Sequence, residues 1–460
     1  MRPVEQSCFW LADVAGAASA PPLGGPAEAD VAIVGGGFTG LWAAHFLKEL
    51  APELDVLLLE GERIAYGATG RNAGMIGETF DHSHALAISH FGLPEARRLA
   101  ALARRNLDEL EAFCATRAPE AAFERSGQLV FALEPRHLEE LEEAKRAAEA
   151  VGVEDWRLLS AEEARAEVDS PLYLGALLHP RAATVHPARL ALALRREAER
   201  TGVRVHESTP VSGWRARGAG IELDTPAGPV RARRAVLATN AYSAALAPRL
   251  GRRFLALYDY VTASEPLTDE DLEAIGWRVR RRAVTDARAF FQYYRLTPDR
   301  RMVWGTSDAV YHPGGRVGRE CDHSAAHYAA LAESFRRTFP ALRPVEFPYA
   351  WGGPICSTTR FTPFFGALGG GRLLYGLGYT GHGVGTTRVA GRILAHLALE
   401  EPSELLDLAL VREPPLPFPP APLRGWAIER VSRALRRLDR GEPPSLLLRL
   451  LDRLGIGLSS

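Results

Sequence analysis

Lysine is nearly absent from this sequence. Lys48 and Lys145 are the only lysines, although Lys and Arg together number 55. Arginine therefore carries almost all of the positive charge. No lysine from residue 146 onward can take part in catalysis.

Cysteine is also scarce, and its positions exclude two common uses. The four cysteines are Cys8, Cys114, Cys321 and Cys356. They form no CxxC pair and no zinc-type spacing. We therefore predict reduced thiols, as in a cytosolic protein, and no metal site.

Long apolar runs and an excess of charge are missing as well. No run of about 18 uncharged apolar residues occurs, which argues against a membrane span. The first five residues include Glu5 and lack an apolar core, so we predict no secretory signal. The net charge is −1, which gives no general attraction to nucleic acid or anionic lipid. We expect a cytoplasmic protein with no nucleic-acid partner.

The 460 residues are too many for one simple core, so we expect two domains. Residues 1–28 are rich in Ala, Gly and Pro and are predicted to form an extended lead-in. The spacing of apolar residues predicts helices at 95–118, 134–151, 187–201 and 386–399. Residues 254–264 and 284–308 alternate and carry many aromatics, which predicts an antiparallel sheet.

A glycine-rich turn follows the first apolar strand, Asp30–Val34. Gly35 permits the tight turn, Gly37 lets the backbone approach a pyrophosphate, and Gly40 allows the following helix to pack closely on the strand. A second strand ends at Glu60, whose carboxylate can accept hydrogen bonds from ribose hydroxyls. This strand–turn–helix–strand unit predicts a dinucleotide site, but the glycine motif alone does not distinguish FAD from NAD.

A second glycine-rich turn, from Gly376 to Gly385, also follows a strand and opens a helix. It matches the same spacing, yet no apolar strand follows that helix, so a second dinucleotide unit cannot close. The alternatives are a helix N-terminus aimed at a bound ligand, or a structural loop at a domain junction.

Three motifs together resemble the D-amino-acid oxidase and glycine oxidase superfamily of FAD-dependent oxidoreductases, most closely the gamma-glutamylputrescine oxidase-like branch. They are Val34-Gly-Gly-Gly-Phe-Thr-Gly40, Gly67-Ala-Thr-Gly-Arg-Asn-Ala-Gly74 and Gly378-Tyr-Thr-Gly-His-Gly383. The resemblance covers about residues 28–400. It implies an α/β plus α+β fold, in which a Rossmann-like FAD-binding domain joins an antiparallel-sheet substrate domain.

The expected domain limits follow from this resemblance. The FAD-binding domain is discontinuous and comprises residues 28–90, 180–250 and 350–400. The substrate domain comprises 91–179 and 251–349, and residues 401–460 form a C-terminal helical extension.

The resemblance implies a set of FAD-binding residues along the chain. They are Gly35, Gly37, Phe38, Thr39, Gly40, Glu60, Thr69, Gly70, Arg71, Asn72, Gly74, Met75, Val211, Thr239, Asn240, Gly353, Gly378, Gly381, His382, Gly383 and Val384. The second glycine turn would direct helix N–H groups at the flavin ring, where they stabilise the charge of reduced flavin.

We expect the FAD to be bound non-covalently. Residues 67–76 contain no His, the residue through which some relatives attach flavin. Cys356 lies near the region where sarcosine oxidases attach flavin through Cys, but the register does not match. A buried packing thiol is the favoured interpretation of Cys356.

The expected reaction is oxidation of a small amine or amino acid, in which hydride passes to flavin N5 and the imine is then hydrolysed. Oxygen or an electron carrier would be the final acceptor. Two alternatives stay open: oxidation of a 2-hydroxy acid, and a non-catalytic flavin-binding protein.

The substrate pocket is predicted to lie on the aromatic sheet. Phe291, Tyr293 and Arg295 share one strand face, and Tyr258 and Tyr260 on the neighbouring strand could complete the pocket. Arg295 could bind a carboxylate through two hydrogen bonds, or could instead be paired within the sheet. The candidates for orienting the substrate are Tyr258, Arg295, Arg360 and His382.

The C-terminal tail is basic and amphipathic. From Arg424 to Arg453 there are 8 Arg against 4 acids, and a leucine stripe runs through Leu446–Leu454. We expect this tail to pack on the body of the protein or on a second subunit. Contact with a membrane surface, with electron delivery to a quinone, is the alternative.

Overall fold

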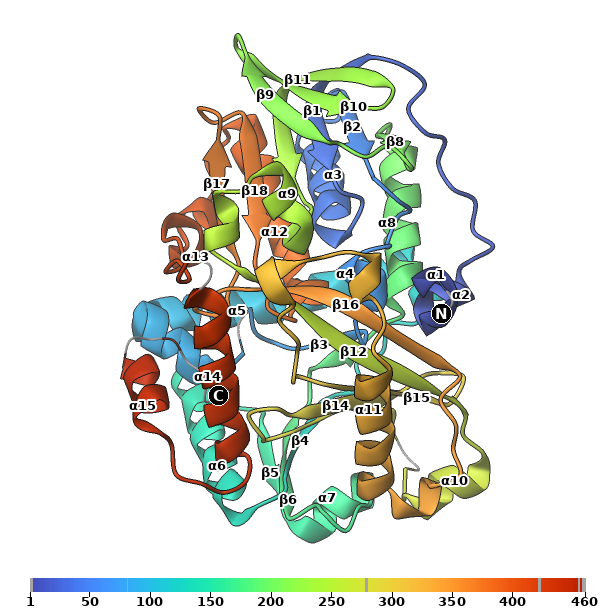
Figure 1. Ribbon diagram of the computed structural model, residues 1–460, viewed down its shortest axis with the longest axis vertical. Coiled ribbons are helices and arrows are strands. Elements are labelled where there is room, and N and C mark those ends of the chain that lie inside the picture. Colours follow the sequence, from blue (N-terminus) through green and yellow to red (C-terminus); the bar gives the residue numbers. More distant parts are fainter. Residues whose placement is uncertain (1–2, 81, 278–279, 421–422, 454–455, 457–460) are drawn as a thin grey trace.

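The computed structural model describes residues 3–80, 82–277, 280–420, 423–453 and 456. One large sheet lies in the upper half of the molecule and a second in the lower half, and helices pack around both (Figure 1). No helix of the described residues is long and apolar enough to cross a membrane.

The upper sheet is mostly parallel and follows the βαβ pattern predicted from the sequence. Its strands are β1 (Ala27–Val34), β2 (Val56–Leu59), β8 (Arg204–His206), β9 (Gly213–Arg217), β10 (Gly220–Thr225), β11 (Gly228–Leu237), β17 (Phe364–Leu368) and β18 (Leu373–Leu377). Across the sheet the order is β17-β18-β11-β1-β2-β8, and the antiparallel β9–β10 pair continues from β11. The order reverses on either side of β1, the arrangement in which α/β proteins bind nucleotides at the carboxyl ends of the strands.

Three helices pack on the upper sheet: α3 (Phe38–Leu50), α8 (Pro187–Arg200) and α12 (Gly383–Leu399). The closest approach is between α3 and α12. A Cβ atom added at Gly391 would lie 2.5 Å from Trp42 Cβ and 2.6 Å from the Trp42 backbone carbon. The glycine therefore lets two helices encoded about 350 residues apart pack backbone to backbone.

The lower sheet is largely antiparallel. Its strands are β4 (Gln128–Ala132), β5 (Arg157–Leu159), β6 (Gly175–His179), β12 (Leu255–Pro266), β13 (Ala283–Asp286), β14 (Gln292–Leu296), β15 (Arg301–Thr306) and β16 (Tyr349–Ser357). Their order is β16-β12-β15-β14-β13-β4-β6-β5. The surrounding helices are α6 (Pro135–Ala150), α7 (Ala161–Glu167), α10 (Asp269–Ala274), α11 (Ala325–Thr338) and α14 (Leu423–Leu438).

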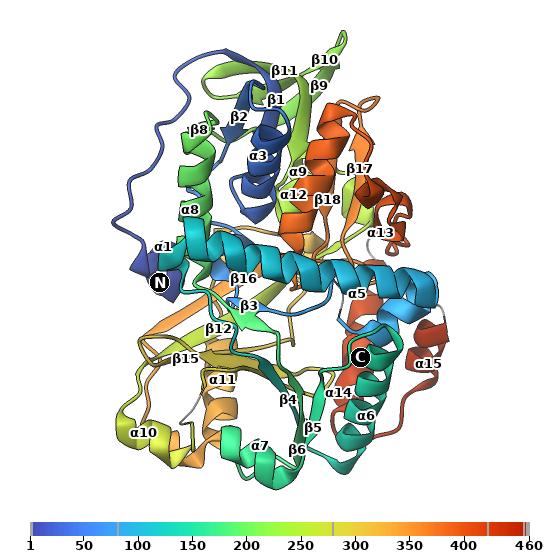
Figure 2. The same ribbon diagram turned by 180° about the vertical axis from the view of Figure 1, so that it is seen from behind.

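The longest helix, α5 (His84–Arg117), runs across the junction of the upper and lower halves, on the side of the molecule that faces the viewer in Figure 2. It is broken at Gly92, where φ is 76° and Pro94 follows closely. A small two-stranded sheet pairs β3 (Met75–Ile76) with β7 (Ala183–Thr184). The fold also contains four short helices: α4 (Ala68–Arg71), α9 (Ser243–Leu246), α13 (Ala409–Arg412) and α15 (Leu446–Arg453).

The fold class predicted from the sequence is confirmed, with one local correction. The extended lead-in predicted for residues 1–28 is wrong at its start, because α1 (Val4–Ser7) and α2 (Phe9–Asp13) are helical. Trp10 is fully buried, and its Nε1 atom donates to Asn72 O at 2.8 Å. Residues 350–400 are predicted to belong to the FAD-binding domain, but β16, which lies within that range, pairs with β12 of the lower sheet.

Gly391→Ala tests the α3–α12 contact. The added methyl group should push the helices apart and cost about 1–3 kcal/mol, as overpacking of a core does, and so lower the thermal midpoint. Gly425→Ala on α14 is the matched control, because nothing lies within 4 Å of that position. Equal thermal midpoints for the two variants would contradict the close packing.

Candidate functional site: a dinucleotide cavity between the two sheets

One large cavity lies between the upper and lower sheets, and both contribute to its lining. Its volume is about 1350 Å³. Typical small-molecule pockets measure about 300–1,000 Å³. The cavity therefore has room for a dinucleotide and a second, smaller molecule.

The first glycine turn opens into this cavity at the carboxyl end of β1. Gly35 has φ 111°, and a Cβ there would lie 2.8 Å from Ala238 O. Gly37 lines the cavity, whereas Gly40 does not. A Cβ at Gly40 would lie 2.0 Å from Gly35 O, so Gly40 serves the close packing of α3 on β1.

The carboxylate of Glu60 lies beside this turn at the end of β2. Its Oε2 atom accepts a hydrogen bond from Gly36 N at 2.6 Å, and its Oε1 atom accepts one from Glu62 N at 2.9 Å. Burial raises the pKa of Glu60 above its usual value, and the two backbone donors oppose that shift. The side chain is thus fixed at the cavity wall, in a position suited to ribose hydroxyls.

A second wall is built around Arg71, at the end of α4. Arg71 Nη1 lies 2.6 Å from Asp322 Oδ1, and the two side chains are only 1% and 3% exposed. Burial alone would lower the pKa of Arg71. The electrostatic interactions with Tyr242 and Asp322 outweigh this effect and hold the pKa of Arg71 above its ordinary value. Within the described part of the chain, Nη2 is buried without a hydrogen-bond partner and is available to an anionic group.

The second glycine turn reaches the same cavity beside the first, since the Thr39 hydroxyl donates to the Tyr379 hydroxyl at 2.9 Å. Gly381, His382, Gly383 and Val384 all line it, at the N-terminus of α12. Neither α12 nor α3 has a side-chain hydrogen bond at its N-cap. Two uncapped helix starts therefore offer N–H groups and positive dipole ends to one ligand.

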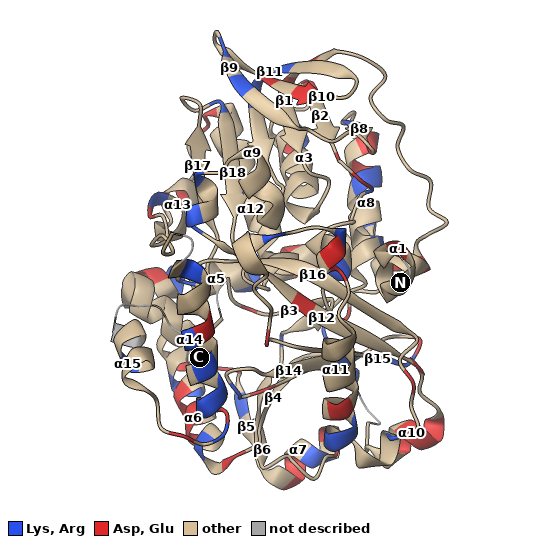
Figure 3. Ribbon diagram, in the orientation of Figure 1, with Lys and Arg blue, Asp and Glu red and all other residues tan. Residues whose placement is uncertain are grey.

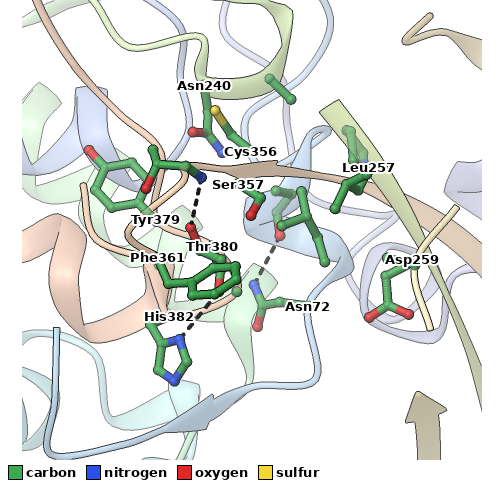
Figure 4. Close-up of a pocket in the computed structure, with 18 of the residues that line it drawn as sticks. Asn72, Asn240, Leu257, Asp259, Cys356, Ser357, Phe361, Tyr379, Thr380 and His382 are labelled. Carbon is green, nitrogen blue, oxygen red and sulfur yellow. Dashed lines mark hydrogen bonds between the residues drawn. The ribbon is translucent and has the colours of Figure 1, made fainter. Parts of the chain in front are cut away.

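His382 lies beside His82, with 4.6 Å between the ring centroids. Both rings contact Thr380 O, at 3.3 Å from His382 Nδ1 and 2.9 Å from His82 Nε2 (Figure 4 shows His382 with Thr380). Burial lowers the pKa of both, that of His382 to about 3. His382 is therefore neutral near pH 7.

Most of the expected FAD-binding residues line the cavity. They are Gly35, Gly37, Phe38, Thr39, Glu60, Thr69, Arg71, Asn72, Met75, Val211, Thr239, Asn240, Gly353, Gly381, His382, Gly383 and Val384. Those that do not line it are Gly40, Gly70, Gly74 and Gly378. At each of these four a Cβ would fall within 2.5 Å of a neighbouring atom, so the glycines shape the walls.

Arg295 lies outside the cavity, so the structure does not support it as a carboxylate anchor. Its Nη1 atom donates to Gly74 O and Val185 O, each at 2.8 Å. Its side chain is buried, and this burial lowers its pKa to about 9. The guanidinium also lies over the Trp10 ring, 5.6 Å from its centroid, and ties the N-terminal helices to the core.

Arg360 and Tyr258 also lie outside the cavity. Arg360 donates to Thr362 Oγ1 at 2.7 Å and to Leu410 O at 3.1 Å, within the structure around α13. Tyr258 donates to Gly318 O at 3.1 Å, on the far face of β12. Of the four substrate-orienting candidates, only His382 lines the cavity.

The face of β12 that lines the cavity is the one opposite to the predicted tyrosine face. It presents Leu255, Leu257, Asp259 and Val261. Alternation along the strand is as expected, but the tyrosines point into the lower core instead. The signal that could have identified the correct face is the single acid, Asp259, among three apolar residues.

Asp259 is the polar group that the sequence interpretation missed. Its Oδ2 atom accepts a hydrogen bond from the Tyr293 hydroxyl on β14, and its Oδ1 atom is buried without a partner among the described residues. Burial raises its pKa to about 7. Figure 4 shows Asp259 in the same cavity as Asn72 and His382.

Cys356 on β16 also lines the cavity and is 1% exposed. Burial raises the pKa of this thiol well above its usual value. The side chain is thus held as the thiol, whereas the thiolate is the reactive form.

A parallel sheet with a glycine turn, facing an antiparallel sheet across a dinucleotide-sized cavity, defines a nucleotide-dependent oxidoreductase. Residues 30–397 match the family model described as FAD dependent oxidoreductase (DAO). The chain belongs to this family and uses FAD. The glycine backbone, the uncapped helix starts and the unused Arg71 nitrogen fit such an anionic dinucleotide.

Known proteins share both the sequence and the fold. The chain is 32% identical over 404 residues to the gamma-glutamylputrescine oxidoreductase of Escherichia coli (strain K12), which covers 85% of this chain and 88% of that protein. The structure resembles glycine oxidase from Geobacillus kaustophilus (TM-score 0.69, 20% identity, 84% of this chain and 99% of that one). It also resembles L-proline dehydrogenase from P. horikoshii (TM-score 0.68, 18% identity, 83% and 96%).

Glu60→Ala should weaken FAD binding by about 10- to 100-fold, because hydrogen bonds to a charged group contribute about 1.5–3 kcal/mol. Titration of the apoprotein with FAD, followed by flavin fluorescence, measures the Kd. Glu53→Ala, in an exposed turn, is the control and should leave the Kd unchanged. The same Kd in both variants would remove Glu60 from the FAD site.

Proposed function

We propose that this enzyme oxidises a small amine or amino acid whose amino group binds at Asp259. When bound, FAD supplies the two-electron acceptor for hydride from the carbon next to that nitrogen, leaving an imine that water hydrolyses. The chain's own residues bind the cofactor, orient the amine and receive its proton.

The cofactor would be held from three sides. Gly35, Gly37 and Glu60 would bind the ADP portion, Arg71 would meet the middle of the molecule, and residues 381–384 would lie by the ring. In this arrangement α3 directs its N-terminus at the phosphates, and α12 directs its own at the flavin. Both dipoles favour negative charge on the ligand.

The observation that carries the proposal is the Asp259 oxygen that has no hydrogen-bond partner among the described residues. A buried carboxylate is costly unless it gains a counter-charge, and a substrate ammonium supplies one. The Tyr293 hydroxyl occupies Oδ2, which leaves Oδ1 for a second donor. Arg288, which also lines the cavity, is already paired with Asp286 at 2.6 Å.

Asp259 also gives the amine a place to lose its proton. Hydride can leave the carbon only when the nitrogen lone pair is free, so an ammonium must first be deprotonated. A carboxylate with a pKa near 7 is suited to that exchange at neutral pH. By contrast, a 2-hydroxy acid has no amino group to pair with Asp259.

The relatives support an amine substrate through the activities that their names state. One is a gamma-glutamylputrescine oxidoreductase, and the structures include a glycine oxidase and a proline dehydrogenase. Each of these compounds carries an oxidisable C–H next to nitrogen.

An anaerobic screen tests the proposal directly. Amines, amino acids and 2-hydroxy acids are mixed with the FAD-loaded protein, and loss of the oxidised flavin absorbance is followed. Amines should bleach the flavin and hydroxy acids should not. Bleaching by hydroxy acids alone would favour that substrate class, and none at all would favour a non-catalytic protein. Readmitting oxygen or an artificial dye then separates an oxidase from a dehydrogenase.

Asp259→Asn should lower kcat/KM for amines by about 10²- to 10⁴-fold, the usual contribution of a positioned acid–base group. The variant keeps the size of the side chain and an acceptor for Tyr293, so its FAD content should be unchanged. Asp269→Asn, on the exposed surface of α10, is the control. Wild-type kcat/KM in Asp259→Asn would exclude Asp259 as the amine site.

The pH dependence provides an independent check. Burial is the largest cause of the raised pKa of Asp259, Asp308 raises it further, and the Tyr293 hydroxyl and Tyr260 N–H oppose them. Since the ionised form is required, kcat/KM should rise as pH increases through about 7. That limb should be absent in Asp259→Asn, and its persistence there would assign it to another group.

A further inference from the structure

The C-terminal extension forms part of the cavity wall, although it lies beyond residues 30–397 of the family match. Helix α14 presents Ala427, Ile428, Val431 and Leu435 to the cavity. Their spacing places them on one face of the helix. The opposite face carries exposed arginines, including Arg430, Arg433 and Arg437 (Figure 3).

Both ends of α14 are fixed to the body, so its position over the cavity is defined. After the helix, the Asp439 carboxylate accepts hydrogen bonds from Ala289 N at 2.8 Å and Phe290 N at 2.9 Å. Arg436 pairs with Asp308 at 2.8 Å. At the other end, Arg424 donates to Gly251 O at 3.0 Å.

The apolar stripe of α14 is not buried in a core. Of its four residues only Leu435 is buried, whereas Ala427, Ile428 and Val431 are half-buried because they face the cavity. The other walls of this end are also largely apolar and include Phe290, Phe291, Leu141 and Ala144. Charged side chains on that side are paired with each other: Glu140 with Arg136 at 3.3 Å, and Asp286 with Arg288 at 2.6 Å.

A continuous path joins this compartment to the amine site. Tyr293, which holds Asp259, lies two residues from Phe291, and both line the cavity. Their ring centroids are 6.4 Å apart. Phe290, the residue before Phe291, donates its N–H to Asp439, the residue that follows α14.

We propose that α14 is the wall of a substrate subsite for a hydrocarbon chain. The preferred substrate is an amine that places its nitrogen at Asp259 and extends an apolar chain past Phe291 to Ile428, Val431 and Leu435. This inference rests on the proposed amine oxidation and adds the substrate class to it.

A series of straight-chain primary amines from propylamine to decylamine tests the subsite in the full-length, FAD-loaded enzyme. Each buried methylene contributes about 0.8 kcal/mol, so kcat/KM should rise up to about fourfold per methylene until the subsite is full. The gain should appear in KM more than in kcat, because the chain contacts do not change during the reaction.

Val431→Asn should flatten this dependence on chain length, so that kcat/KM falls far more for decylamine than for propylamine, while FAD content stays at the wild-type level. Arg433→Asn, on the exposed face of the same helix, is the matched control and should keep the wild-type slope. Val431→Phe keeps the wall apolar but fills the space, and it should move the optimum to shorter amines.

The outcomes separate the subsite from the reaction. A flat chain-length series in the wild type, or a wild-type slope in Val431→Asn, would overturn the subsite and leave amine oxidation standing. If Val431→Asn does not fold, an unchanged optimum in Val431→Phe would overturn it instead. Failure of every amine to bleach the flavin would remove both the subsite and the proposed function.

Discussion

The structure depends on the close packing of α3 against α12. Gly391 lets the two helix backbones meet at Trp42, and the Thr39 hydroxyl donates to the Tyr379 hydroxyl at 2.9 Å near their N-termini. Residues about 340 positions apart in the chain are thereby held side by side. Both helices start at the cavity without a side-chain hydrogen bond at the N-cap, so a molecule that fills the cavity would meet both dipoles. An anionic dinucleotide is the ligand that this arrangement favours.

The lower sheet supplies the other half of the site, and its chemistry is sparse. Its cavity face is mostly apolar, with the Asp259–Tyr293 pair as its distinctive polar feature. Oxidation of an amine by flavin requires orientation, exclusion of water and a place for one proton. In the proposed function the Asp259 carboxylate meets these requirements, and in the proposed subsite α14 would extend the wall toward the far end of the substrate.

The sequence predicts the glycine turn and the strand ends that line the upper part of the cavity, because local rules govern them. Glycines at Gly35, Gly37 and Gly40 are required by backbone contacts within one βαβ unit, so their spacing is readable without a structure. Glu60 is equally local, since it ends the second strand of that unit. The second glycine turn needed the family resemblance, because only tertiary packing brings residues 381–384 to the same cavity.

The substrate half could not be predicted as well. Alternation along β12 identifies two faces but does not say which one is covered by the lower core, and the tyrosines proved to be on that side. Arg295 follows Tyr293 on the same strand face, yet it lies outside the cavity. Its guanidinium already donates hydrogen bonds to Gly74 O and Val185 O. The contribution of α14 depends on docking contacts such as that of Asp439, which have no sequence signature.

A crystal structure of the purified protein with bound FAD is the most direct measurement of the central claim. The account predicts one FAD per chain, with its pyrophosphate at the N-terminus of α3 and its flavin ring against residues 381–384 at the N-terminus of α12. A flavin ring remote from residues 381–384, or a dinucleotide bound away from Gly35 and Gly37, would contradict it.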